Sequence, residues 1–133
     1  MKQDLEEKIG KRDDCIFLPY TDELISYMKI ADIILTKPGG LTTTEVAAMR
    51  KPLIHTMPIP GCENYNAEYF SKKKMSLKSE NVEEICQNIK KVWQDHNLRE
   101  EMIENQKQQI DPHASEKIVQ FVLDQIKETQ KEK

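Results

Sequence analysis

The chain has 133 residues and carries 20 Lys and Arg against 23 Asp and Glu, a formal net charge of −3. This length suits one domain of ordinary size and makes two complete domains unlikely. The near balance of charges lacks the basic footprint of a nucleic-acid-binding protein, so we expect no nucleic-acid partner. No apolar run approaches the roughly 18 residues that a spanning helix needs.

The apolar residues come in short runs, separated by amphipathic stretches. Continuous apolar runs of this length are typical of strands buried on both faces, as in a parallel sheet. In chain order, we expect strands over 15–18, 31–36 and 52–56, and a weaker fourth strand over 74–77. His55 lies within the third run, and we expect a packed or edge histidine rather than a catalyst.

Helical spacing fills the intervals between these runs. Thr21 can cap a first helix, and Thr42 with Glu45 has the spacing of a capping box for a second. A third helix is expected over 63–72. Asn81 begins a fourth, whose apolar face would include Trp93. Two C-terminal helices are expected within about 97–129, the second after Asp111-Pro112.

The alternation of strand and helix predicts an α/β fold, a Rossmann-like parallel sheet with helices on both faces. A doubly wound sheet normally has five or six strands, and only three or four are visible here. We therefore expect residues 1–133 to form a single, truncated domain whose first strands are missing.

The densest chemical signal is the stretch 36–45, which follows a strand and opens a helix. Gly39 and Gly40 let the backbone approach a ligand, and the helix N-terminus offers unpaired N–H groups, an arrangement that suits phosphate. The stretch matches neither the Walker loop nor the Gly-x-Gly-x-x-Gly fingerprint. A strand-to-helix turn capped by Thr42 and Glu45 would explain the same residues without a ligand, and both interpretations stay open.

A second loop, over 57–66, also follows a strand and opens a helix. Ligands of open α/β sheets bind beyond the carboxyl ends of the strands, so both loops are expected at one edge. The three cysteines, Cys15, Cys62 and Cys86, are widely spaced and fit neither a disulfide framework nor a zinc site. We expect reduced thiols in a cytoplasmic protein and no bound metal.

Together the two loops carry a family resemblance. The motifs are Lys37-Pro38-Gly39-Gly40-Leu41-Thr42-x-x-Glu45 and Pro58-x-Pro60-Gly61-x-Glu63-x-x-Asn66-Ala67. From about residue 14 to 127, the chain resembles the C-terminal donor-binding domain of glycosyltransferase family 28. It is most similar to processive diacylglycerol glucosyltransferases and monogalactosyldiacylglycerol synthases. The resemblance implies the two-domain GT-B architecture.

The resemblance also implies roles for particular residues. The diphosphate of a UDP-sugar would face the first loop, Glu45 would accept hydrogen bonds from the ribose, and the uracil would border the end of the first strand. The donor sugar would lie at the second loop, where Cys62 replaces the glutamine common in the family. The implied residues are Tyr20, Thr21, Pro38, Gly39, Gly40, Leu41, Thr42 and Glu45 for the nucleotide, and Gly61, Cys62, Glu63 and Asn66 for the sugar.

The function so implied is the donor-binding part of a hexosyltransferase that moves a sugar from a UDP-sugar to a lipid such as diacylglycerol, without a cofactor. The acceptor site and general base would lie in a missing N-terminal domain or a partner chain, so the isolated chain is expected to be inactive. A peripheral place at the inner face of the membrane and a homodimer are further expectations. The alternatives are a non-catalytic relic or interaction module, and another GT-B enzyme such as a sugar-nucleotide epimerase.

Overall fold

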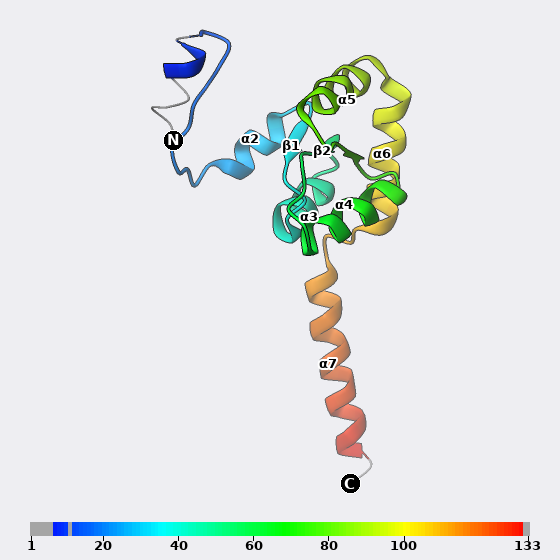
Figure 1. Ribbon diagram of the computed structural model, residues 1–133. Coiled ribbons are helices and arrows are strands. Elements are labelled where there is room, and N and C mark those ends of the chain that lie inside the picture. Colours follow the sequence, from blue (N-terminus) through cyan, green and yellow to red (C-terminus); the bar gives the residue numbers. More distant parts are fainter. Residues whose placement is uncertain (1–6, 11, 132–133) are drawn as a thin grey trace. The chain divides into compact units, whose positions relative to one another are not determined.

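The computed structural model describes residues 7–10 and 12–131, which fall into two compact units divided between Ile30 and Ala31 (Figure 1). The first unit contains helix α2, Leu24–Ile30. The predicted strand over 15–18 is wrong, because this segment has no regular structure. In the described part of this unit no second strand offers a ladder partner, and Ile16 is 77% exposed.

The second unit holds a three-stranded parallel sheet in the order β1-β2-β3. The strands are β1 (Ile34–Thr36), β2 (Leu53–His55) and β3 (Leu77–Lys78). Ile34 pairs with Leu53 and Thr36 with His55. This confirms the predicted α/β class and the parallel sheet. Strands β1 and β2 are shorter than their apolar runs, and β3 begins only at the last residue of the run predicted over 74–77.

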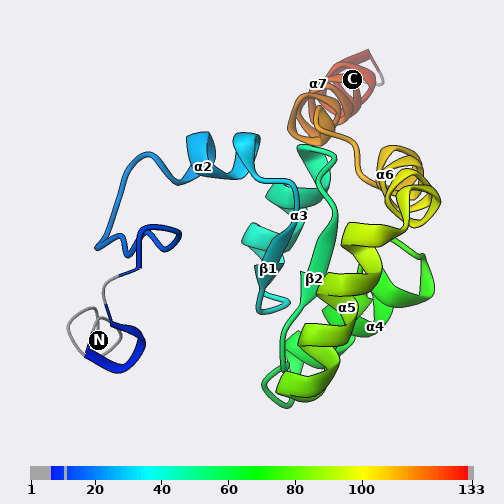
Figure 2. The same ribbon diagram turned by 90° about the horizontal axis from the view of Figure 1, so that it is seen from above.

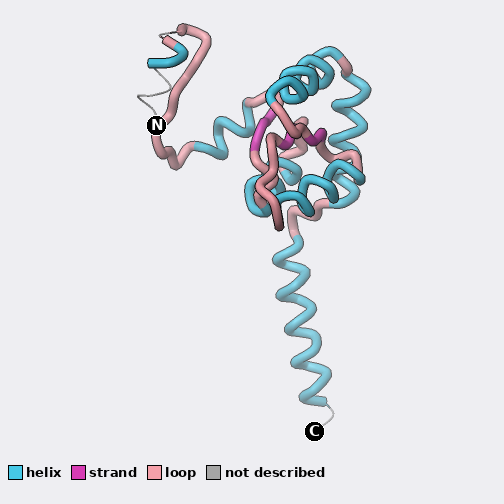
Figure 3. The backbone as a smooth tube through the Cα atoms, in the orientation of Figure 1, coloured by secondary structure: helices cyan, strands magenta, loops and turns pink. Residues whose placement is uncertain are grey.

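Each strand of this unit is followed by a helix (Figure 3). Helices α3 (Gly40–Ala48) and α4 (Cys62–Lys72) lie on one side of the sheet and α5 (Val82–Gln94) on the other (Figures 1 and 2). Helix α6 (His96–Gln109) packs against α3 and α5, and α7 (Ala114–Lys131) follows it.

The core lies between the sheet and these helices. Its most completely buried apolar side chains are Val46, Ala47, Leu53, Ile54, Ala67, Met75, Val92 and Met102. Buried polar contacts add to the packing of α6. The Gln106 amide Nε2 donates to the carbonyls of Lys51 and Met75, at 2.9 Å each, and so joins α6 to the segments that precede β2 and β3.

The predicted starts of α5 and α3 have different outcomes. The one at α5 is confirmed: the Asn81 side chain caps the helix by accepting from the Glu84 N–H at 2.9 Å, and its amide donates to the Glu84 carboxylate. The one at α3 is wrong, because the helix begins at Gly40 with Gly39 as N-cap and no side-chain cap. Thr42 therefore lies inside the first turn.

Trp93 departs from the predicted apolar face of its helix. Val92, the preceding residue, is buried, whereas Trp93 is 62% exposed near the C-terminus of α5. The apolar positions of α7 were predicted from helical spacing, and the helix is confirmed. Its apolar side chains are nevertheless exposed.

Candidate functional site

The two loops singled out in the sequence follow the adjacent strands β1 and β2. Because these strands are parallel and Thr36 pairs with His55, both loops leave the sheet at its carboxyl edge. The Thr56 N–H donates to the Thr36 carbonyl at 2.9 Å, which continues the pairing to this edge. The structure thus confirms the predicted shared location of the loops.

A side chain from the second helix ties the two loops together. Asn66, in the second turn of α4, donates from Nδ2 to the Pro38 carbonyl at 2.9 Å. Pro38 is buried and directly precedes the N-cap of α3. This contact joins the N-terminal segments of α3 and α4, so an anion could meet groups of both loops.

The start of α3 is open to a ligand. A side-chain carbon placed on Gly39 or Gly40 would meet nothing within 4 Å. The first amides of any α-helix have no intrahelical acceptor, and the helix dipole adds positive potential there. With no side-chain cap at this terminus, the backbone donors of Gly40, Leu41 and Thr42 suit an anionic ligand.

Two of the three consecutive threonines at the start of α3 use their hydroxyls in contacts within the protein. Thr43 is buried and its Oγ1 lies 3.2 Å from His55 Nε2. Thr44 donates from Oγ1 to the Gly40 carbonyl at 2.7 Å. Of the three hydroxyls, that of Thr42 is therefore the one that suits a ligand.

One face of α3 combines an apolar and an acidic side chain in solvent. Leu41 and Glu45 are four residues apart, so they lie on the same face of the helix. Leu41 is 83% exposed, and Glu45 is also exposed. A carboxylate one turn beyond the open N-terminus could accept hydrogen bonds from a sugar hydroxyl.

Beneath this edge lies a buried histidine. His55 ends β2, and its ring nitrogens lie 3.2 Å from Thr43 Oγ1 and 3.1 Å from Ser76 Oγ. The ring also meets Phe70 edge-on, with centroids 5.7 Å apart. Burial lowers the pKa of His55 from 6.5 to about 4, so the ring is neutral at neutral pH. The predicted packed histidine is confirmed.

The second loop contains a backbone conformation that requires glycine. Gly61, the N-cap of α4, adopts φ 113° and ψ −133°, which only glycine adopts readily. Glu63 accepts from the Ile59 N–H at 2.7 Å, so this carboxylate shapes the loop. Cys62 begins α4 and is exposed. The sugar-binding roles of these residues stay predictions.

Tyr20 and Thr21 belong to the first compact unit. Tyr20 is exposed, and Thr21 Oγ1 accepts from the Glu23 N–H at 3.1 Å, just before α2. Their predicted place beside the uracil stays a prediction.

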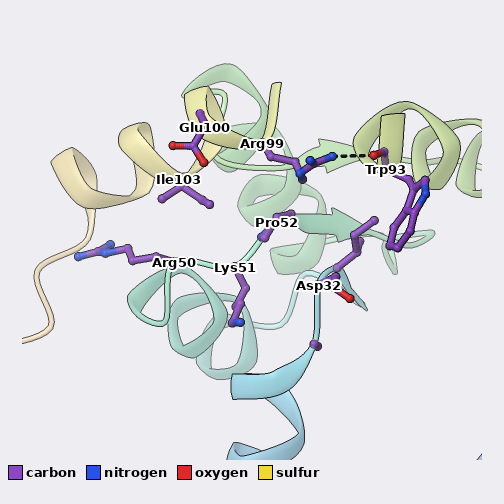
Figure 4. A pocket seen from close by; sticks show the side chains of 10 residues that line it. Asp32, Arg50, Lys51, Pro52, Trp93, Arg99, Glu100 and Ile103 are labelled. Atoms are coloured by element: carbon purple, nitrogen blue, oxygen red, sulfur yellow. Dashed lines mark hydrogen bonds between the residues drawn. The ribbon is translucent and has the colours of Figure 1, made fainter. Parts of the chain in front are cut away.

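A pocket that the sequence analysis missed lies at the opposite, amino edge of the sheet and measures about 320 Å³ (Figure 4). It is lined by segments that precede β1 and β2 and by parts of α5 and α6. Arg99 Nη1 donates to the carbonyls of Val92 and Trp93, at 2.6 and 2.7 Å. Arg50 donates to the carbonyls of Gln106 and Ile110 near the end of α6. Both guanidinium groups thus satisfy helix C-termini.

Two features are absent from the described ranges, 7–10 and 12–131. No group of three His, Cys, Asp or Glu there could hold a metal ion. None of the helices there has the length and hydropathy needed to cross a bilayer.

Comparison with known proteins places the chain among glycosyltransferases. Residues 1–109 match the family described as glycosyl transferases group 1. The chain belongs to this family. Among curated proteins it is 31% identical to the processive diacylglycerol beta-glucosyltransferase of Bacillus pumilus (strain SAFR-032), over 81% of this chain and 28% of that protein.

Other relatives carry the same name. The Staphylococcus carnosus (strain TM300) protein is 34% identical over 78% of this chain and 27% of its own length. The Staphylococcus aureus (strain MRSA252) protein is 30% identical over 95% of this chain and 32% of its own length. These matches confirm the resemblance to processive diacylglycerol glucosyltransferases. The chain spans less than a third of each of these relatives, and no solved structure matches it.

Proposed function

We propose that this chain is the donor-binding part of a glycosyltransferase, which binds a UDP-sugar and serves transfer of a hexose to a lipid acceptor. Family membership and the relatives' names support glycosyl transfer. The observation that carries the proposal is the open, uncapped start of α3, tied to the second loop by the Asn66–Pro38 hydrogen bond.

The diphosphate is the part of the donor that this edge suits best. We place it against the amides of Gly40, Leu41 and Thr42, where N–H groups and the helix dipole favour negative charge. As the bond to the sugar breaks, charge develops on the departing UDP, and fixed donors stabilise it without reorganising. In this proposal the chain needs no cofactor beyond the UDP-sugar substrate.

Glu45 is the proposed ribose ligand. It lies on the same face as Leu41, one turn beyond the phosphate-binding amides, and a carboxylate can accept from two neighbouring hydroxyls. The second loop would hold the sugar, through backbone groups near Gly61 and the exposed side chain of Cys62. A thiol cannot both donate and accept as an amide does, so fewer sugar contacts are expected here.

We propose that the binding site for the acceptor, such as diacylglycerol, and the general base belong to another domain or a partner chain. We also propose a peripheral location at a membrane. The lysines in and after α4 could attract an anionic membrane surface, but three of them are paired with carboxylates. Lys72 pairs with Glu68, Lys74 with Glu101 and Lys78 with Glu80, at 3.6, 2.6 and 3.0 Å. These carboxylates offset the attraction of the lysines to an anionic surface.

Calorimetric titration with UDP tests the proposal. We expect millimolar or tighter binding by the chain, and at least a roughly tenfold loss of affinity in Glu45→Gln. The matched control is Glu83→Gln, an exposed glutamate in the first turn of α5, on the other side of the sheet, which should leave affinity unchanged. Circular dichroism shows whether each variant is folded. No binding by a folded chain would contradict the proposal and favour a non-catalytic module.

A further inference from the structure

Both ring nitrogens of His55 lie within hydrogen-bonding distance of a hydroxyl that is itself buried. Nε2 lies 3.2 Å from Thr43 Oγ1, on α3, and Nδ1 lies 3.1 Å from Ser76 Oγ, just before β3. The three residues are at most 2% exposed. A side chain that loses its partner in such a place keeps the full cost of burying a polar group. The geometry of these contacts is therefore strongly determined.

Thr43 connects the ring to the turn that we propose for the diphosphate. It is the fourth residue of α3, and its N–H donates to the carbonyl of Gly39, the N-cap, at 3.1 Å. This hydrogen bond closes the first helical turn, which contains the amides of residues 40–42. The side chain of Thr43 thus joins that turn to β2 through His55.

The turn is held from two neighbouring elements. Asn66, on α4, donates to the Pro38 carbonyl at 2.9 Å, just before the turn begins. His55, on β2, contacts Thr43 where the turn closes. Since no side chain caps the helix in between, these two contacts determine where the free amides point. Donors that are fixed in this way stabilise a negative charge without reorganising.

We propose that His55 is a positioning residue for the donor, which holds the first turn of α3 through Thr43 in the orientation that the diphosphate needs. This inference rests on the proposed function, in which a UDP-sugar binds at that turn. His55 is completely buried beneath the turn, so it acts on the nucleotide only through Thr43. A histidine that merely packs would contribute to stability and leave donor affinity alone.

The environment of the ring suits this task. Burial lowers the pKa of His55 to about 4, so the neutral ring can donate from one nitrogen and accept at the other. Phe70 meets the ring edge-on, with centroids 5.7 Å apart and planes at 72°, which restricts its rotation. The nitrogen that faces Thr43 is thus held in place from two sides.

Two substitutions separate the two contacts of the ring. In His55→Gln the amide reaches about the place of Nε2, so the contact to Thr43 can persist. In His55→Asn the shorter side chain reaches about the place of Nδ1, so only the contact to Ser76 can persist. Calorimetric titration with UDP should show about a fivefold loss of affinity in His55→Asn and at most about a twofold loss in His55→Gln.

Thr43→Val removes the same contact from the side of the helix. Valine keeps the shape of threonine, so we expect a folded chain with about the same fivefold loss of UDP affinity. The double variant His55→Asn/Thr43→Val should lose no more than either single variant, because both remove one contact.

Ser79→Ala is the matched control. Ser79 is buried, and its Oγ accepts from Asn88 Nδ2 at 2.9 Å, on α5 at the other side of the sheet. The substitution should lower the urea concentration at the midpoint of unfolding and leave UDP affinity unchanged.

The outcomes separate this inference from the proposed function. Full UDP affinity in folded Thr43→Val and His55→Asn would overturn the inference alone. Losses of affinity that follow the loss of stability in every variant, Ser79→Ala included, would also overturn it. Failure of the unmodified, folded chain to bind UDP would contradict the proposed function itself, and this inference with it.

Discussion

At the scale of single residues, His55 connects three elements beneath the candidate site. It ends β2 and lies within hydrogen-bonding distance of Thr43 on α3 and of Ser76 just before β3. The neutral ring can donate from one nitrogen and accept at the other, so it can bond both hydroxyls. Protonation would add a buried charge and remove the accepting nitrogen.

The lowered pKa of His55 predicts how stability depends on pH. Above pH 6.5 the ring is neutral whether the chain is folded or unfolded. Between pH 6.5 and about 4 the unfolded chain takes up a proton that the folded chain excludes. The free energy of unfolding therefore decreases as the pH is lowered through this range. The loss from this group is at most about 1.4 kcal/mol per pH unit. Urea unfolding at several pH values measures it.

A histidine variant separates this effect from the titration of other groups. His55→Asn should unfold with a shallower pH dependence between pH 6.5 and 4 than the unmodified chain. Equal slopes in the two proteins would contradict the lowered pKa of the buried ring.

Asn66 carries the second prediction at this scale. Asn66→Ala removes the hydrogen bond to the Pro38 carbonyl and should lower the free energy of unfolding by about 1 kcal/mol. It should also weaken UDP binding, because the two loops are no longer held together. Asn64→Ala, at a half-buried asparagine two residues earlier, is the control. Equal losses of UDP affinity in the two variants would contradict the proposed coupling of the loops.

At the scale of elements, two stretches with the same local spacing behave differently. Thr42–Glu45 and Asn81–Glu84 both have the spacing of a capping box, and only Asn81 caps its helix. Gly39 and Gly40 let α3 begin three residues earlier than the box requires. The cap at α3 is thus absent at the terminus that we propose for the diphosphate.

This difference predicts opposite results for two alanine variants. Asn81→Ala should lower the free energy of unfolding by about 1 kcal/mol, because it removes a helix cap. Thr42→Ala should leave stability unchanged or slightly raised, since alanine is the better helix former. Urea unfolding of both variants at pH 7.5 compares them. A similar loss in Thr42→Ala would mean that Thr42 caps α3 in solution.

The sequence predicts those elements whose signal is local. The runs at 31–36 and 52–56 contain β1 and β2, and the helix boundaries after β2 lie within a few residues of the prediction. The run at 15–18 has the same apolar character and forms no strand, because a strand also needs a neighbour to pair with. Periodicity placed Trp93 in the core, although it lies beside the exposed C-terminus of α5.

The candidate site was predictable only where its signal is local in the sequence. Glycines at the end of a strand mark a loop that a ligand can approach, and this pattern is visible in the sequence. The hydrogen bond from Asn66 to Pro38 joins residues 28 positions apart and depends on how α3 and α4 pack. The inward turn of Thr43 toward His55 has the same tertiary origin.

At the scale of the whole molecule, family membership and the position of the loops support one account. The chain belongs to a glycosyltransferase family, spans less than a third of each of the three named relatives, and carries two loops at one sheet edge. Donor binding can be carried by such an edge, whereas transfer also needs an acceptor site. We therefore expect the chain to bind UDP at this edge.

The most direct test is an NMR titration of the ¹⁵N-labelled chain with UDP. The account predicts that amide shifts concentrate at Gly39, Gly40, Leu41 and Thr42, with smaller shifts near Gly61, and that Arg99 and Ile103 at the opposite edge stay unchanged. A folded chain without shifts at these loops, or with shifts confined to the amino-edge pocket, would contradict donor binding at the carboxyl edge.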